Sequence, residues 1–390
     1  MSDKKQKPAI PGSVYILTGC VAVIGCNSLA LGPIAPLVSR SLEVTVPTVM
    51  TATAAFGLGA AFSALFLAHH IDRFGAYRML KLAMCILPLA LLAAATAVAL
   101  PVLVLAQLCA GIASGVAVPS IYSNAASLAP PGGESRTIGV VLTGWTLSMV
   151  AGVSLSAILA DYFGWRAVYL AVALLGVFAL LYLNFMKPMS STSIKKAAPM
   201  PLSALNLPGI KPLLCVCATS MAAFYGTYAF LGDYLTHGLG QALSANGLTA
   251  FTYGIGFGGA VLFDHAVNRL GAKKALPLAL LLLVVIYLLL GFIGTSLGMV
   301  LGLMVLLGLG NHYAINLLIV RLVGIDPSKR GSVLGLHSAT TNFSVFLGTS
   351  TFGYLYSSGG FAMITCAAAA LAFLATLASM IPTKRVESLA

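Results

Sequence analysis

One passage occurs twice in this chain, about half its length apart. A glycine-rich apolar run at 56–61 leads into a basic turn at 69–76, and a similar run at 253–258 leads into a similar turn at 265–272. The offset is 197 positions for the apolar runs and 196 for the turns. Self-similarity at a fixed offset indicates a chain that is built from two copies of one structural unit.

The composition indicates that these units lie in a lipid bilayer. Hydrophobic residues make up 59% of the 390 residues and charged residues only 8%, with a mean hydropathy of +1.00. So few charges would not cover the surface of a soluble protein of this size. Apolar runs of about 18 residues or more predict membrane spans. Twelve are predicted, at 13–38, 47–69, 77–98, 101–128, 136–161, 164–186, 211–236, 245–265, 274–294, 297–322, 331–357 and 360–381.

The basic residues predict the orientation of these spans. If the N-terminus is cytoplasmic, 19 of the 21 Lys and Arg residues fall in cytoplasmic loops or tails, and only Arg40 and Arg166 fall outside. The positive-inside rule therefore predicts a multi-pass protein of the cell (inner) membrane with both termini in the cytoplasm. The net charge of +12 is then an orientation signal, and no nucleic-acid partner is predicted.

The predicted fold is an all-α membrane protein of two pseudo-symmetric six-helix bundles. A cytoplasmic tail at 1–12 precedes the N-terminal bundle at 13–186. A linker at 187–210, rich in Ser, Pro and Lys, leads to the C-terminal bundle at 211–381 and a tail at 382–390. Two repeated halves of this kind are typical of secondary transporters.

The turn after the second span resembles the loop motif of the major facilitator superfamily. It reads Asp72-Arg73-Phe74-Gly75, with Arg78 following. Further agreement comes from Pro119 after Gly111 and Gly115, from Gly164-Trp165-Arg166, and from Pro327-Ser328-Lys329-Arg330-Gly331. The resemblance covers essentially the whole chain and points to the twelve-helix branch of drug, sugar and nucleoside efflux proteins, which includes proton antiporters.

The resemblance implies a gating role for this turn, which comprises Asp72, Arg73, Gly75 and Arg78. Asp72 would face the positive N-terminus of the eleventh span and hold the cytoplasmic side shut. Gly75 would permit the tight turn. The alternative is a solvated loop without a gating contact.

The sequence departs from the family pattern at four places, two of which concern energy coupling. Ala68 and Ala76 stand at the glycine that opens the loop motif and at a basic position after it. Gln107 stands where many proton-coupled members carry Arg, and Gly152-Val153 replaces the Gly-Pro pair of the antiporter motif. The departures at Gln107 and at Gly152-Val153 weaken a direct inference of proton antiport.

Three titratable side chains are candidates for coupling. Asp233, near the outer end of the seventh span, is the acidic residue that could face a central cavity, because the other eight acids lie in tails, loops or span ends. A carboxylate that persists in a membrane is often functional, although one near the interface can simply be solvated. His312 and His337 lie within spans, where a histidine either exchanges protons or packs through hydrogen bonds.

Neutral polar residues within the spans predict the rest of a cavity. They are Asn27, Gln107, Tyr225, Tyr228, Asn311, Asn316 and Asn342. Such groups need partners in hydrocarbon, which a substrate, cavity water or another helix could supply. Aromatic rings with amides suit a neutral or weakly cationic organic solute, whereas a phosphate-like anion would require Arg or Lys in the cavity.

No catalytic, metal or cofactor site is predicted, so the chain is not expected to be an enzyme. The prediction is a monomeric secondary active transporter that moves a small organic solute by alternating access, as proton-coupled efflux. Its partners would be that solute, the lipid bilayer and, for the antiporter, protons. Two alternatives remain open: a facilitative uniporter of a neutral solute, and a membrane sensor or assembly protein that does not transport.

Overall fold

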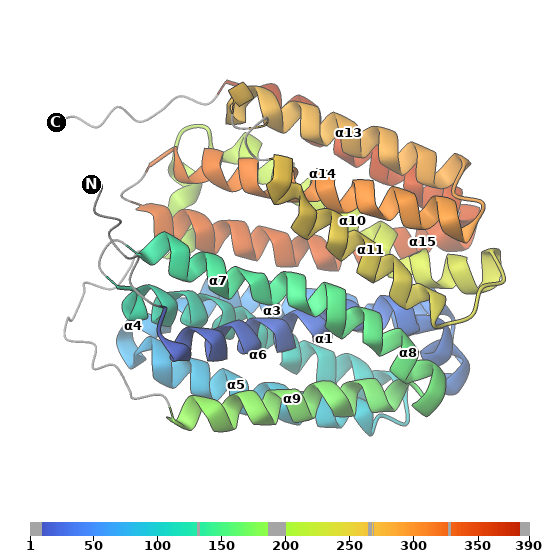
Figure 1. The fold of residues 1–390 in the computed structure, drawn as a ribbon, viewed down its shortest axis with the longest axis horizontal. Helices are drawn as coiled ribbons and strands as arrows, with labels where there is room; N and C mark the ends of the chain where they lie inside the picture. The colour runs from blue at the N-terminus through green and yellow to red at the C-terminus, as the bar shows by residue number, and fades with distance from the viewer. Residues whose placement is uncertain are drawn as a thin grey trace, which may run out of the picture.

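The computed structural model describes residues 10–130, 133–185, 200–263, 267, 269–326 and 329–382. Every regular element in this part of the chain is a helix. Most of the helices run along the long axis of the molecule (Figure 1). Ten of the described helical segments are long and apolar enough to cross a membrane.

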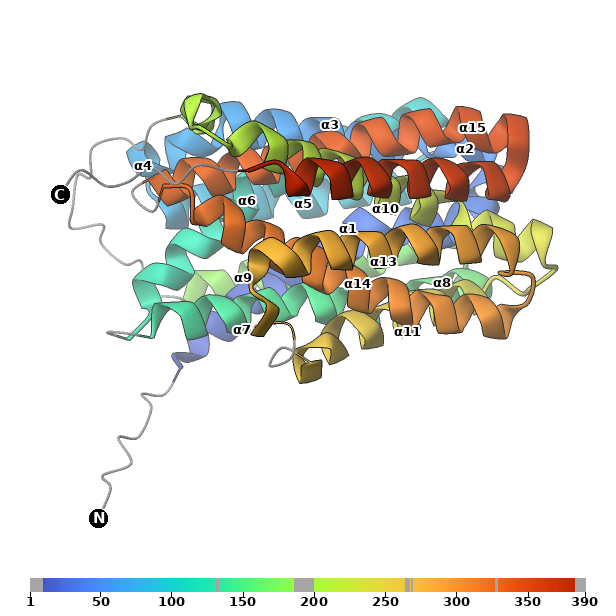
Figure 2. The same ribbon diagram turned by 90° about the horizontal axis from the view of Figure 1, so that it is seen from above.

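Two elements complete the predicted set of twelve helices. α11 (Ala245–Gly259) has 15 residues and continues into the 3-10 turn η5 (Ala260–Phe263). α15 (Arg330–Met380) has 51 residues and turns back at Gly360, where φ is 66° and ψ is −161°. Only glycine adopts this conformation readily, so α15 forms two antiparallel arms (Figure 2). The prediction of twelve helices in two bundles is confirmed.

The first half of the chain contains six membrane-crossing segments. Their elements are α1 (Gly12–Leu42); α2 (Val46–Val49) with α3 (Thr51–Phe66); η1 (Ala68–His70) and α4 (Ile71–Phe74) before α5 (Ala76–Ala95); α6 (Leu100–Leu128); α7 (Glu134–Leu147), the π-helix η2 (Ser148–Val153) and α8 (Ser154–Phe163); and α9 (Trp165–Phe185).

The second half repeats this organisation. Its elements are η3 (Pro201–Asn206), α10 (Ile210–Asp233) with the π-helix η4 (Tyr234–Gly238), α11 with η5, α13 (Ala272–Phe292), α14 (Leu297–Val323) and α15. Of the predicted linker at 187–210, residues 187–199 lie outside the described residues, and α10 already begins at Ile210. Most of both predicted tails, 1–9 and 383–390, also lies outside.

The two halves lie side by side along the long axis (Figures 1 and 2). α1 begins and α15 ends at the same end of the molecule, which we call the terminal end (Figure 1). The opposite end, where α1 ends at Leu42 and η4 ends at Gly238, is the distal end.

Close glycine contacts recur at the offset of the sequence repeat. Gly111 of α6 faces the backbone carbonyl of Phe56 in α3, and Gly308 of α14 faces the backbone carbonyl of Tyr253 in α11, with no room for a Cβ atom at either glycine. Both members of the second pair are 197 positions after their counterparts. The repeat in the sequence is therefore a repeat in helix packing, based on small residues that let backbones approach closely.

Glycines also line the interface between the two halves. Gly57 of α3 contacts the backbone of α15, and Gly254 of α11 contacts η2. Nearer the distal end, Gly232 of α10 lies against the carbonyl of Gly32 in α1. At these glycines the helices of the two halves approach closely.

Candidate functional site

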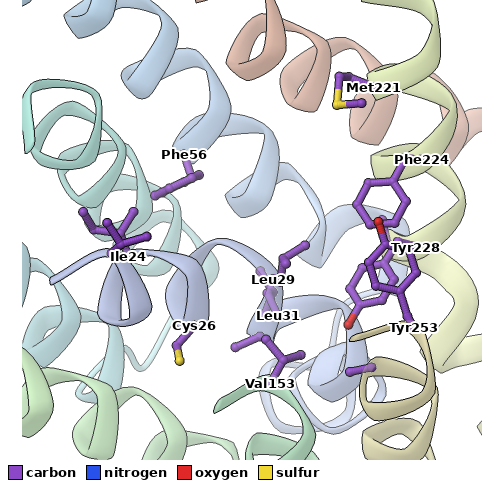
Figure 3. Packing of buried hydrophobic residues seen from close by; sticks show 14 of the residues in the cluster. Ile24, Cys26, Leu29, Leu31, Phe56, Val153, Met221, Phe224, Tyr228 and Tyr253 are labelled. Atoms are coloured by element: carbon purple, nitrogen blue, oxygen red, sulfur yellow. The ribbon is translucent and has the colours of Figure 1, made fainter. Parts of the chain in front are cut away.

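Aromatic side chains form a continuous series across three helices of the second half. Phe224 of α10 stacks on Tyr228, with ring centroids 5.6 Å apart, and on Tyr253 of α11, at 5.1 Å. Tyr253 stacks on Phe257 at 6.1 Å, and Phe257 meets the edge of His312 in α14 at 5.0 Å. Figure 3 shows the first three rings together beside α1. We call these five residues the aromatic series.

Two asparagines of α14 supply polar groups along this series. The Asn311 amide donates to the Tyr253 hydroxyl at 3.2 Å, while the buried Asn311 carbonyl oxygen has no hydrogen-bond partner among the described residues. Asn316, which is exposed, lies 2.8 Å from Nε2 of His312. Because an amide nitrogen only donates, this contact assigns Nε2 of His312 as an acceptor.

The two predicted tyrosines of α10 lie at the interface between the halves. Tyr225 and Tyr228 line a narrow cleft with Ser28, Leu29, Gly32, Met50, Thr53 and Ala229. The cleft has a volume of only about 10 Å³ and lies between α10 and the first half, so an organic solute could enter it only after the halves move apart. Tyr228 belongs both to this cleft and to the aromatic series, so the two features are continuous.

Asn27 and Gln107 form a buried pair within the first half. Each amide nitrogen donates to the other residue's carbonyl oxygen at 3.1 Å, and both residues are almost fully buried. The pair joins α1 to α6 and satisfies one donor and one acceptor on each side chain. This geometry favours the helix–helix explanation for these two residues over a direct substrate contact.

The two predicted α15 residues make contacts within the second half. The Asn342 amide donates to the carbonyl of Ser338, one turn earlier, at 2.9 Å. The backbone carbonyl of His337 lies 3.9 Å from the thiol of Cys217 in α10, and the His337 side chain is half-buried. These contacts fit helix packing.

Asp233 is the centre of a hydrogen-bonded network at the distal end. Its Oδ1 lies 2.6 Å from Nδ1 of His237, and its Oδ2 accepts from the Tyr356 hydroxyl of α15 at 2.6 Å. Nε2 of His237 lies 3.0 Å from Nη2 of Arg40 in α1. The network, comprising Arg40, His237, Asp233 and Tyr356, therefore joins the two halves.

Sequence reasoning did not find three members of this network. His237 follows Asp233 by four residues, a spacing that places both on one face of a helix. Arg40 and His237 are 197 positions apart, which is the repeat offset, so they occupy equivalent positions in the two halves. Nothing in the sequence singles out Tyr356, which comes close through the packing of α15.

The structure describes part of the predicted gating turn. Gly75 has φ 89°, which favours glycine, and α5 begins immediately after it. Arg73 and Arg78 are exposed, and the Arg73 guanidinium lies 5.4 Å from the centre of the Phe74 ring. The Asp72 side chain lies outside the described residues, so its contact with the eleventh span stays a prediction.

Within the described residues, no group of three or more His, Cys, Asp or Glu side chains is close enough to hold a metal ion. The polar groups of the aromatic series are two hydroxyls and one imidazole, and Asn311 and Asn316 add amides beside it. This arrangement can stack on flat rings and exchange hydrogen bonds with a neutral solute.

The fold, with its two repeated helical halves, is typical of membrane transporters, and comparison with known proteins gives its family. Residues 17–325 match the family model of the Major Facilitator Superfamily. The chain belongs to this superfamily, which confirms the resemblance seen in the sequence.

Individual relatives agree with this assignment. An uncharacterized MFS-type transporter of Bacillus subtilis is 24% identical over 396 residues, which cover 100% of this chain and 96% of the relative. A chloramphenicol resistance protein of Streptomyces lividans is 27% identical over 281 residues, 70% of this chain and 71% of the relative. A crystal structure of a bacterial homologue of the human lysosomal transporter Spinster, inward-facing and occupied, has a TM-score of 0.73 at 16% identity, covering 94% of each chain.

Proposed function

We propose that this protein is a secondary active transporter of the cell membrane that exports a small, neutral or weakly cationic aromatic solute. The aromatic series carries this proposal, because it continues into the cleft between the halves and has only neutral hydrogen-bonding partners in the described contacts. Flat rings of a solute gain stacking and burial there, while amides fix its orientation.

The orientation of the proposed transporter follows from its charges. The excess of Lys and Arg in the loops on one side supports a cytoplasmic terminal end and an external distal end. The direction of transport is supported by the relative that is named as a chloramphenicol resistance protein, since resistance to a toxic solute fits its removal from the cell.

Alternating access is supported by the way in which the halves meet. Gly57 and Gly232 face backbone atoms of the other half, and Gly254 faces the small side chain of Val150. At such contacts the helices can rock against each other without disengaging long side chains. A solute in the cleft beside Tyr225 and Tyr228 would then be exposed first to one side of the membrane and then to the other.

Two coupling modes are consistent with these residues. Proton-coupled efflux is favoured by the network around Asp233, in which a carboxylate and an imidazole share a hydrogen bond. A facilitative uniporter is favoured by the Asn27–Gln107 pair, because a neutral amide pair occupies the position where many proton-coupled relatives carry Arg. Accumulation of solute against its gradient in response to a pH difference distinguishes the two.

The test is transport by the purified, monodisperse protein in proteoliposomes. Chloramphenicol, a neutral nitroaromatic amide, is the first probe, followed by a nucleoside, a weakly basic aromatic drug and a sugar phosphate. Protein-dependent transport of a neutral or weakly cationic aromatic probe, without transport of the sugar phosphate, is the expected result. Transport of the sugar phosphate alone would contradict the proposed solute class, and a folded protein that neither binds nor moves any of the probes would contradict the proposed function.

A further inference from the structure

The network at the distal end is a series of hydrogen bonds that contains charged side chains from both halves. It runs from Arg40 of α1 through His237 and Asp233 to Tyr356 of α15. The His237 side chain is 48% exposed and that of Asp233 is 12% exposed, so solvent at the distal end reaches the imidazole while the carboxylate is mostly covered.

The contacts of His237 assign its protonation state. A guanidinium only donates hydrogen bonds, so Nε2 of His237, 3.0 Å from Nη2 of Arg40, must accept. Nδ1 then carries the proton and donates it to Oδ1 of Asp233 at 2.6 Å. Tyr356 donates to the second oxygen of the same carboxylate. Every hydrogen bond of this four-residue network has one donor and one acceptor when His237 is neutral and Asp233 is ionised.

Adding one proton to His237 disrupts the link between the halves. The proton must go to Nε2, where its N–H would point at a donor of Arg40 and two positive charges would face each other. At the same time the imidazolium forms a stronger, charge-assisted hydrogen bond with Asp233. Protonation therefore replaces a bond between the halves with an ion pair inside the second half.

The other groups near His237 do not compensate for this change. Asp233 of α10 and Arg40 of α1 are the charged groups that face it, and Tyr234 and Tyr356 are the nearby phenols. From α11, the amide of Asn246 lies 3.5 Å from Thr236 Oγ1 and donates to the carbonyl of Pro33 in α1 at 2.7 Å. Asn246 is not titratable, so its bond across the interface does not depend on pH.

The position of the network gives the change a mechanical consequence. His237 lies in the π-helix η4, directly beyond the point where Gly232 of α10 meets Gly32 of α1. π-helical segments often occur at functional sites, where they change the direction of side chains. The Arg40–His237 bond thus spans the interface at the distal end, just outside the closest backbone contact there.

We propose that Arg40, His237 and Asp233 form a proton-operated latch on the external side of the protein. Neutral His237 holds the external end closed through Arg40, and a proton taken up from the outside by Nε2 releases Arg40 and allows this end to open. The proposal rests on the proposed orientation and alternating access, but not on the identity of the solute. In an exporter, external acidity would promote opening to the side where the solute leaves.

The latch is tested by measuring the width of the external opening without any solute. Spin labels at Val98→Cys and Thr295→Cys report it, because these exposed residues lie in loops at the distal end of the first and second half. The labels are placed in the full chain with its seven native cysteines replaced, in lipid nanodiscs. Pulsed dipolar spectroscopy then gives the distance distribution between pH 8 and pH 5.

The wild-type sequence is expected to show a several-fold larger long-distance population at pH 5 than at pH 8. His237→Gln retains a hydrogen-bond donor and an acceptor but does not titrate. Its label-to-label distances should therefore stay at the short values of the closed state at every pH. The same result is expected for His237→Asn. Arg40→Ala should be open already at pH 8. Arg166→Ala is the matched control, because Arg166 bonds to Ser41 and the Ala97 carbonyl within its own half.

The latch is overturned if either His237 variant gains the long-distance population at pH 5 as strongly as the wild type does. It is also overturned if Arg40→Ala shows only the short distances of the closed state at pH 8. Solute transport is measured separately on the same variants. A wild-type protein that transports an aromatic probe but shows no pH response contradicts the latch alone, whereas a wild-type protein with the expected pH response that transports no aromatic probe contradicts the proposed function alone.

Discussion

At the residue scale, Phe224 is the central ring of the aromatic series. It stacks on Tyr228 and Tyr253 and contacts the edge of Tyr225 at 5.1 Å, so three tyrosines of two helices meet at one side chain. Phe224 is buried, whereas Phe343 of α15 is 45% exposed. The two phenylalanines therefore separate a role in the site from a general effect of removing an aromatic ring.

Phe224→Ala is expected to reduce transport of an aromatic probe about 10-fold or more in proteoliposomes. The substitution removes the surface on which two rings stack, and stacked aromatic pairs contribute about 0.5–1.5 kcal/mol each beyond their burial. Phe343→Ala should transport at close to the wild-type rate. Equal losses in the two variants, at equal amounts of folded protein, would show that Phe224 has no specific role in transport.

The Asn27–Gln107 pair allows a second prediction at this scale. Gln107→Leu leaves the buried Asn27 amide without its partner, which should lower stability by about 1–2 kcal/mol, within the range for unpaired buried polar groups. The double variant Asn27→Leu, Gln107→Leu removes both polar groups and should recover most of this loss. Thermal unfolding in detergent measures both effects. If the double variant is less stable than Gln107→Leu, the two side chains do not act as an isolated hydrogen-bonded pair.

At the scale of the element, small residues decide how closely neighbouring helices approach. Gly111 and Gly308 make equivalent contacts with Phe56 and Tyr253 in the two halves. Tyr253 belongs to the aromatic series, so the approach of α14 to α11 also positions the site. Packing and the proposed recognition of the solute thus involve the same helix pair.

Gly308→Ala is expected to lower the free energy of unfolding by about 1–3 kcal/mol, the usual cost of overpacking a tight contact. The new Cβ would meet the Tyr253 backbone carbonyl, which belongs to a helix and cannot turn away. Gly302→Ala in the same helix is the control, since its Cβ would meet no atom within 4 Å and alanine favours helix. Thermal unfolding compares the two. If both substitutions are neutral, α11 and α14 do not rely on this contact.

At the scale of the whole molecule, the distal network connects proton binding to the relative position of the halves. Asp233 orients His237 and also accepts a hydrogen bond from Tyr356, so the carboxylate joins α10 to α15. The link to α1 through Arg40 depends on this arrangement, since Asp233 sets which nitrogen of His237 carries the proton. A change in charge at one carboxylate can therefore alter the coupling of transport to protons without disturbing the aromatic series.

Asp233→Asn is expected to abolish accumulation of solute driven by a pH gradient while preserving downhill exchange. Exchange requires the cleft but no net proton movement, whereas accumulation requires a group whose protonation differs between the two access states. Asp161→Asn, at an exposed carboxylate near the distal end of α8, is the matched control and should accumulate solute normally. Proteoliposomes with and without an imposed pH difference measure both properties. A wild type that never accumulates solute would instead favour the uniporter.

The sequence by itself determined the membrane environment, the twelve helices and the two repeated halves, because hydropathy, glycine content and the 197-residue offset are properties of local segments. The tertiary structure decided which polar residues meet. Asn27 forms hydrogen bonds with Gln107, 80 positions away, and Arg40 contacts His237, 197 positions away. Such pairs depend on the rotation and tilt of each helix, which are set by packing against its neighbours and not by the hydropathy of its own sequence.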